Sequence, residues 1–196
     1  MDIVANKRLF TEIFNNNISR EGSQALLEYL DKSDFFVAPA SSRFHSNTEG
    51  GLCRHSINVY ERLKDIVDHY RANGEDFGIS DESIAICGLL HDLCKVNFYA
   101  VEFRNAKIDG KWEQVPYYSV KDSLPYGHGE KSVYIINGYM RLTREEALAV
   151  NWHMGGFDMR VKAGDYSISG AYKSYPLAMF THIADMTATY LDESVY

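Results

Sequence analysis

The feature that most constrains the fold is an unbroken apolar run, residues 84–90, that ends in His91 and Asp92. Apolar residues on nearly every side predict a central, buried helix, and Ser80 predicts its N-terminal cap. We expect this helix to run to about Cys94, so that an imidazole and a carboxylate lie near its inner end. Such groups are costly to bury unless they are hydrogen-bonded to neighbours or bound to a metal. On its own the dipeptide leaves both alternatives open.

The composition predicts one globular domain, residues 1–196. The chain is 45% hydrophobic with an ordinary charged fraction of 24%, which is typical of a folded protein with a real core. Its formal net charge is −7, and long nucleic acids prefer basic grooves. No long duplex nucleic acid is therefore expected as a partner, whereas nucleotides and short single strands are compatible with this charge.

The cysteines and the apolar runs indicate the cellular compartment. Cys53, Cys87 and Cys94 form an odd, unpatterned set, which favours reduced core thiols over disulfides. For Cys87 and Cys94, core packing is favoured over metal ligation. Neither a secretory leader nor an apolar run of about 20 residues is apparent. We expect a soluble cytoplasmic protein with no membrane partner.

Hydrophobic periodicity predicts an all-α helical bundle. Residues 1–40 form an expected N-terminal helical extension, and a loop is expected over 157–174. One segment departs from the helical pattern, because two aromatic-rich strands flank Asp109-Gly110 over about 98–120 and predict a β-hairpin insertion. The helices are expected over about 3–18, 21–32, 52–72, 80–94, 127–140, 143–153 and 176–192.

Six polar residues at the ends of separate expected helices are candidate metal ligands. Taken singly, each histidine has a structural explanation, and for His55 alone a core imidazole bonded to a carbonyl is the favoured one. Taken together in a bundle interior they suit transition metals better than calcium, and they exceed what one tetrahedral zinc uses. Two divalent ions, among Mn, Fe, Zn, Ni or Co, would use all six, with Asp92 as the shared carboxylate. The candidates are His55, His91, Asp92, His128, His153 and Asp185.

The order and context of these residues resemble a known superfamily. His55, His91-Asp92 and Asp185 match the order H…HD…D of the HD-domain metal-dependent phosphohydrolases, and His128 and His153 resemble the extra ligands of its two-metal members. The likeness extends from about residue 45 to 191, through "GGLCRHS", "CGLLHDLCK", "GHGEKS", "NWHMGG" and "HIADMTATYLD". It is greatest to the HD domain of 3′→5′ exoribonucleases that carry an OB-fold. No OB-fold is expected ahead of His55 here.

The resemblance implies specific roles. His55, His91, Asp92 and Asp185 would hold the first ion, while Asp92, His128 and His153 would hold the second. A metal-activated hydroxide would attack phosphorus, making Asp92 catalytic. Lys95 resembles the lysine that meets the substrate phosphate in this superfamily.

Further substrate contacts are weaker candidates. Lys131 and Arg54 are possible phosphate ligands, and His45 could reach substrate from its loop. Tyr99 and Tyr118, from the hairpin, could stack on a nucleobase; packing of these rings onto the helices is an equal alternative.

The expected function is hydrolysis of a phosphate ester or anhydride, with a nucleotide or short oligonucleotide as the small phosphorylated substrate. Two alternatives are retained. Mixed-valent di-iron oxygenases of the same superfamily use a similar ligand set, and a non-catalytic, metal-containing binding or regulatory module would also keep it. Oxygen-dependent turnover without phosphate release would favour the oxygenase.

Overall fold

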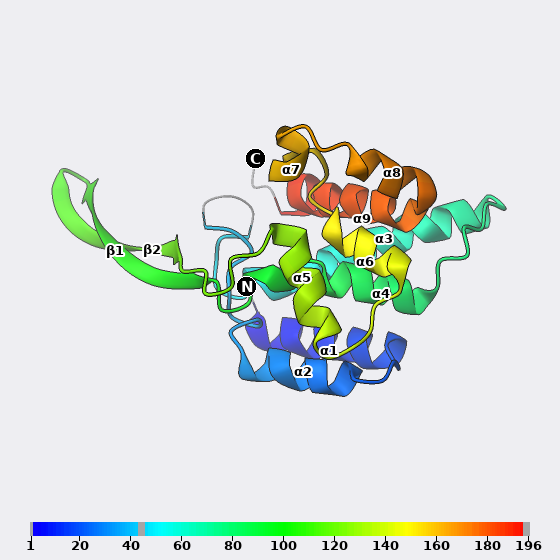
Figure 1. Ribbon diagram of the computed structural model, residues 1–196. Helices are drawn as coiled ribbons and strands as arrows, with labels where there is room; N and C mark the ends of the chain where they lie inside the picture. Colours follow the sequence, from blue (N-terminus) through cyan, green and yellow to red (C-terminus); the bar gives the residue numbers. More distant parts are fainter. Residues whose placement is uncertain (1, 43–45, 194–196) are drawn as a thin grey trace.

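The computed structural model describes residues 2–42 and 46–193, which form a mostly helical bundle with one β-hairpin (Figure 1). The predicted helical class and the hairpin are therefore confirmed. Helices α1 and α2 lie on one side of the bundle, and α8 and α9 lie on the opposite side. The α-helices are α1 (Ile3–Asn17), α2 (Ser23–Lys32), α3 (Gly51–Ala72), α4 (Asp81–Leu90), α5 (His128–Asn137), α6 (Arg144–Asn151), α7 (Met159–Lys162), α8 (Ser167–Ser174) and α9 (Pro176–Thr187).

The centre of the bundle is the crossing of α3 and α4. A Cβ atom on Gly88 would lie 2.5 Å from the Cα of Tyr60, so only glycine lets the two backbones approach this closely. Close packing here places the rings of His55 and His91 with their centroids 5.2 Å apart. The segment that ends in His91 and Asp92 therefore shapes the site through the backbone of Gly88 as well as through these two side chains.

The N-terminal helices belong to the same core. Phe10 and Phe14 of α1 are fully buried in the cluster that also contains α3 and α4. Just after α1, the guanidinium of Arg20 donates to both carboxylate oxygens of Glu146, at 2.6 and 2.9 Å, and to Glu82 at 3.0 Å. A bidentate, partly buried pair of this kind fixes orientation as well as charge, so it ties the N-terminal segment to α4 and α6.

Two sequence expectations about helix limits are wrong. Helix α4 ends at Leu90, and residues Leu93–Lys95 form a separate 3₁₀ turn, because Asp92 leaves the helical region at φ −103°, ψ 21°. The expected loop over 157–174 instead contains α7 and α8. Asp158 caps α7 by accepting the amide of Arg160, a short-range signal that the glycines and serines around it obscure.

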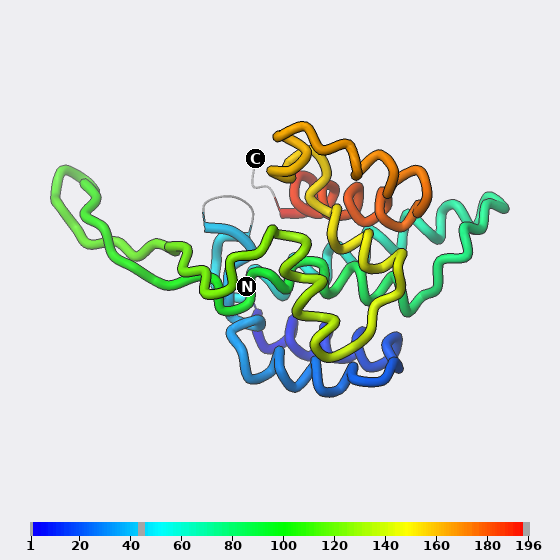
Figure 2. The backbone as a smooth tube through the Cα atoms, in the orientation of Figure 1, coloured from blue at the N-terminus to red at the C-terminus, as the bar shows by residue number. Residues whose placement is uncertain are grey.

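The hairpin pairs β1 (Tyr99–Ile108) with β2 (Lys111–Val120) in antiparallel register. Its turn is the predicted Asp109-Gly110, both with positive φ, as a tight two-residue hairpin turn requires. The backbone trace shows the hairpin extending away from the helices (Figure 2). Phe103 and Trp112 are 63% and 73% exposed, so these aromatics do not pack onto the bundle.

In the described part of the chain, none of the helices has the length and apolarity that a bilayer crossing needs.

Candidate metal centre

Asp92 is the centre of a buried polar cluster at the inner end of α4. His91 caps the helix, and the change of backbone direction at Asp92 turns the carboxylate toward α3 and α5. Both residues are almost completely buried. Burying a carboxylate here requires charged or hydrogen-bonding partners on both of its oxygens, and the structure supplies them from several separate segments.

The two oxygens of Asp92 face different histidine pairs. The Nε2 atoms of His91 and His55 lie 3.5 and 3.6 Å from Oδ2. On the other side, the Nε2 atoms of His128 and His153 lie 2.9 and 3.5 Å from Oδ1. A carboxylate that offers one oxygen to each of two donor groups is arranged as a bridging ligand would be.

Asp185 completes the first group from α9. Its Oδ1 lies 3.2 Å from Nε2 of His55, and small buried residues, Ala178, Thr181 and Ala188, accompany it along that helix. The ligand-type atoms of His55, His91 and Asp185 lie within 4.8 Å of one another, as do those of His91, Asp92 and His153. All six residues expected as ligands are therefore brought together.

Hydrogen bonds on the far side of two rings direct their lone pairs inward. Nδ1 of His91 donates to the carbonyl of Gly88 at 3.0 Å, and Nδ1 of His153 donates to that of Val150 at 2.7 Å. Because a carbonyl only accepts, the neutral imidazole carries its proton on Nδ1 and presents a bare Nε2. Nε2 of His153 is buried and has no hydrogen-bond partner among residues 2–42 and 46–193. Burial opposes a charge on this ring, but Asp92 raises its pKa, so a metal ion between Nε2 and the carboxylate would take the place of a proton there.

The pKa values of these side chains bear on whether they can bind a metal ion. Burial lowers the pKa of His91 to about 3 and also lowers that of His128, so both rings are neutral near pH 7. Burial opposes the charge of Asp92, yet Lys95 and His91 lower its pKa well below the usual range. Burial disfavours His55 as a cation, but hydrogen bonds and charge from Asp185 and Glu193 raise its pKa to about 10. His55 must therefore lose a proton before it can bind an ion, and the set then consists of ionised carboxylates and neutral imidazoles, which suits transition-metal ions.

Glu193 is a site residue that the sequence reasoning missed. Its Oε1 lies 2.9 Å from Nδ1 of His55 and accepts from Asn58 at 2.9 Å, while Oε2 accepts from Ser46 at 2.6 Å. It thereby orients His55 as the backbone carbonyls orient His91 and His153. The only signal in the sequence was an acid about two turns after Asp185, which a π-helical stretch, Ala188–Asp192, carries back toward α3.

The residues that follow Asp92 also point into the centre. Nζ of Lys95 donates to Oδ2 of Asp92 at 2.6 Å. Sγ of Cys94 lies 3.8 Å from Oδ1 of Asp92 and 3.4 Å from both ring nitrogens of His128. Cys94 is buried as expected, but it packs against the polar cluster as well as the core; Cys53 and Cys87 are buried, free thiols.

An open cleft of about 1830 Å³ lies over the centre. Of the predicted substrate contacts, Arg54, Lys95 and Tyr99 line it, together with Phe157 and Lys162. Cations and aromatic rings therefore share the lining of the cleft with carboxylates such as Glu61 and Asp65.

The other predicted contacts lie elsewhere. Within the described residues, Lys131 and Tyr118 are not among those that line the cleft. Nζ of Lys131 bonds to Asp122 at 2.5 Å and lies over the ring of Phe98, whereas Tyr118 packs edge-on against Tyr99. His45 lies outside the described residues.

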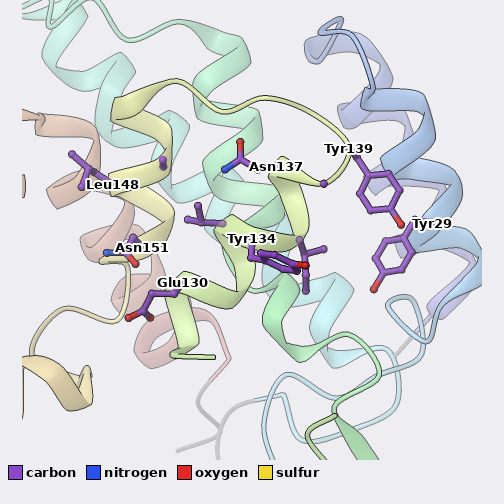
Figure 3. Close-up of a pocket in the computed structure, with 11 residues that line it drawn as sticks. Tyr29, Glu130, Tyr134, Asn137, Tyr139, Leu148 and Asn151 are labelled. Carbon is purple, nitrogen blue, oxygen red and sulfur yellow. The ribbon is translucent and has the colours of Figure 1, made fainter. Parts of the chain in front are cut away.

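A second hollow of about 950 Å³ lies between α5, α6 and α2 (Figure 3), and none of the six candidate ligands lines it. Tyr29 and Tyr139 stack at one end of it, with ring centroids 5.1 Å apart. At the other end, Glu130 forms an ion pair with Arg160 at 2.5 Å. Its lining is mostly apolar and carries no group of metal-ligating side chains among the described residues.

Comparisons of this chain with family models, with curated proteins and with solved structures found no match in any of the three.

Proposed function

We propose that this chain is a metal-dependent phosphohydrolase of the HD-domain type that cleaves phosphate ester or anhydride bonds of a nucleotide or short oligonucleotide. The observation that carries the proposal is the placement of Asp92, whose two oxygens face two separate groups of histidine Nε2 atoms. Two divalent ions held on either side of that carboxylate are the arrangement used for in-line attack on phosphorus.

The candidate ligands fall into two groups that share Asp92. His55, His91 and Asp185 would hold one ion and His128 and His153 the other, with Asp92 shared. Ions bound there would lower the pKa of a shared water and polarise a phosphoryl oxygen. The carbonyls of Gly88 and Val150 and the carboxylate of Glu193 accept from the Nδ1 atoms of His91, His153 and His55 and so orient the Nε2 atoms of these rings as ligands. The burial of Asp92 and His91 keeps bulk water from the ligand side of the site.

Lys95 is the candidate group for transition-state charge. Lys95 lines the cleft, bonds to Asp92 and is largely buried. Burial disfavours that charge, but Asp92 raises the pKa of Lys95 above its usual range, so it is protonated at every physiological pH. A fixed cation beside the reacting phosphoryl group stabilises developing negative charge, and a single such donor is worth about 10²–10³ in rate.

The cleft supports a small substrate. Arg54 and Lys162 can meet phosphate, and Tyr99 and Phe157 offer aromatic faces to a base. Acidic residues, including Glu61, share the lining, and the chain carries a net charge of −7. A long polyanion would be repelled by this surface, whereas a mononucleotide or a short strand fits beside the cations.

The test combines metal content with turnover. Protein purified without added metal is analysed for bound elements, and hydrolysis of bis-p-nitrophenyl phosphate is measured with Mn²⁺, Fe²⁺, Co²⁺ or Zn²⁺. About two ions per chain with turnover supports the proposal, and a panel of nucleotides and short oligonucleotides then identifies the substrate class. Asp92→Asn should lose both properties, while Asp34→Asn, which changes a half-buried carboxylate bonded to the amide of Asn97, should keep them.

Other outcomes would redirect the assignment. One ion with turnover would reduce His128 and His153 to substrate contacts. Two irons with oxygen consumption and no hydrolysis would identify the di-iron oxygenase chemistry. Absence of any bound metal would leave a binding module.

A further inference from the structure

We infer that Cys94 binds the metal ion on the Oδ1 side of Asp92, as a thiolate, so that this position has a sulfur ligand and the opposite position has none. The inference rests on the proposed metal centre and adds one ligand to it. It departs from the expectation that Cys94 serves only in core packing.

The distances fit a four-coordinate ion. With metal–nitrogen bonds of about 2.0–2.1 Å and a metal–sulfur bond of about 2.3 Å, tetrahedral angles separate sulfur from a neighbouring nitrogen or oxygen by about 3.5–3.6 Å. Sγ of Cys94 lies 3.8 Å from Oδ1 of Asp92 and 3.4 Å from both ring nitrogens of His128, and the ligand atoms of these three residues lie within 4.8 Å of one another. Because Sγ is equally close to Nδ1 and Nε2, it lies beside the ring, and the Cys94 side chain must turn toward Oδ1 to share an ion with Nε2.

An independent observation points to the same position. Nε2 of His153 is fully buried, has no hydrogen-bond partner in the described part of the chain and lies 3.5 Å from Oδ1 of Asp92. Its lone pair therefore points to the carboxylate oxygen that Cys94 and His128 also approach. Asp92, His128, His153 and Cys94 supply one oxygen, two nitrogens and one sulfur, the four ligands that a tetrahedral site needs.

The fold holds Cys94 in place for this role. The 3₁₀ turn Leu93–Lys95 follows Asp92 directly, and the amide of Cys94 donates to Oγ of Ser132 at 3.0 Å. Ser132 lies one turn after His128 on α5, so the same helix face supplies a ligand and the residue that anchors its neighbour. Cys94 is 3% exposed, which shields a thiolate from oxidants.

A sulfur ligand would make the two metal positions chemically different. Soft thiolates favour Zn²⁺, Fe²⁺ or Co²⁺ over the harder Mn²⁺ and Mg²⁺, which prefer oxygen. The Oδ2 side, with His55, His91 and Asp185, offers only nitrogen and oxygen. We therefore expect Mn²⁺ to compete less well for the Oδ1 side, and the thiol proton to be released as the ion binds.

The experiment uses Co²⁺ as a spectroscopic probe in the full-length chain. Metal-free protein is titrated with Co²⁺ while bound cobalt is counted and the near-ultraviolet absorption is recorded. Sulfur ligation gives an intense sulfur-to-cobalt charge-transfer band, which nitrogen and oxygen ligands lack. Cys94→Ser and Cys94→Ala should abolish the band and weaken the second equivalent more than tenfold, since even outer-shell changes cost about 10–100-fold in affinity. Cys87→Ala, which removes an equally buried thiol, should keep the band.

The results separate this inference from the proposed function. Bound cobalt without the band in the wild-type chain, or a band that survives in the folded Cys94→Ser variant, would overturn the ligand assignment and leave the phosphohydrolase proposal standing. A band without phosphodiester hydrolysis would support the ligand and count against the enzyme. Failure to bind cobalt would overturn both.

Discussion

The ammonium nitrogen of Lys95 and Oδ2 of Asp92 form a 2.6 Å ion pair inside the ring of imidazoles. The same carboxylate oxygen faces His55 and His91, so the lysine charge is present where an ion would also be attracted. In the metal-free protein this pair is the main compensation for a buried carboxylate.

Replacing Lys95 by Met should therefore have two separable effects. Turnover should fall about 10²–10³-fold with bound metal retained, because a fixed cation at the phosphoryl group is lost. The metal-free variant should lose stability, by at most about 3–5 kcal/mol, since the buried carboxylate loses its closest cation but keeps its histidine contacts. Metal content, steady-state rates and urea unfolding with and without chelator measure these effects. Lys64→Met, in an exposed i,i+4 pair with Asp68, is the matched control; unchanged kinetics in Lys95→Met would remove Lys95 from the reaction.

The pH dependence of the metal-free protein follows from two imidazoles. His55 has its pKa raised to about 10, so its contribution to stability is complete below its unfolded pKa of about 6.5 and is lost as pH rises toward 10. His91 has its pKa lowered to about 3, so its contribution is present above about 6.5 and is lost on acidification toward 3. Together they place maximum stability of the metal-free protein near pH 6.5.

Metal binding should show the opposite trend above that maximum. His55 must give up its proton to bind an ion, so affinity should rise with pH, by up to about tenfold per unit, between pH 7 and 9. Calorimetric titration in buffers of different ionisation enthalpy would detect the released proton. A pH-independent affinity with no proton release would show that His55 binds no metal.

Gly88 should matter for both packing and metal affinity. A methyl group there would meet the backbone of Tyr60 at 2.5 Å, so α3 and α4 must separate and His55 must move away from His91. We expect Gly88→Ala to lose about 1–3 kcal/mol of stability and to bind metal more weakly. In Gly170→Ala, a glycine within α8 whose new methyl group would meet nothing within 4 Å, stability should be unchanged or slightly higher. Equal melting temperatures for the two variants would contradict the close-crossing argument.

Glu193 is expected to act as a positioning residue for His55. Glu193→Gln removes the negative charge that holds the Nδ1 proton of that ring, and it should weaken metal binding about 10–100-fold with the fold retained. Asp192→Asn removes the same charge from the neighbouring residue, which bonds to Arg62 instead, and metal affinity should stay near that of the wild type. Equal losses in both variants would indicate a general charge effect.

Much of the fold was readable because its signals are local. The Ser80 cap and the Asp109-Gly110 turn each involve a few neighbouring residues, and the structure has both. The six-residue polar cluster was also predicted, since histidines on the apolar faces of separate helices are buried where those faces meet. Where those faces meet depends on Gly88 and on the packing of α9 on α3.

The features that were missed depend on geometry that no short pattern encodes. Glu193 reaches His55 only through the π-helical end of the last helix. Cys94 turns toward His128 because α4 stops at Leu90 and the chain changes direction at Asp92. Lys131, a candidate for phosphate binding, has its charge engaged by Asp122. For Glu193 and Cys94 a local backbone change decides which way the side chain faces, whereas for Lys131 an ion-pair partner decides it.

The two tryptophans of the chain lie in opposite environments, so the fluorescence of one of them can be used to follow the candidate metal centre. Trp112 is 73% exposed on the hairpin, whereas Trp152 is 5% exposed, lies under the guanidinium of Arg160 at 3.9 Å and directly precedes His153. With Trp112 changed to Phe, all remaining indole emission would come from a ring adjacent to a candidate ligand. Filling of the centre by a paramagnetic ion would then register as quenching, read in real time without any attached dye.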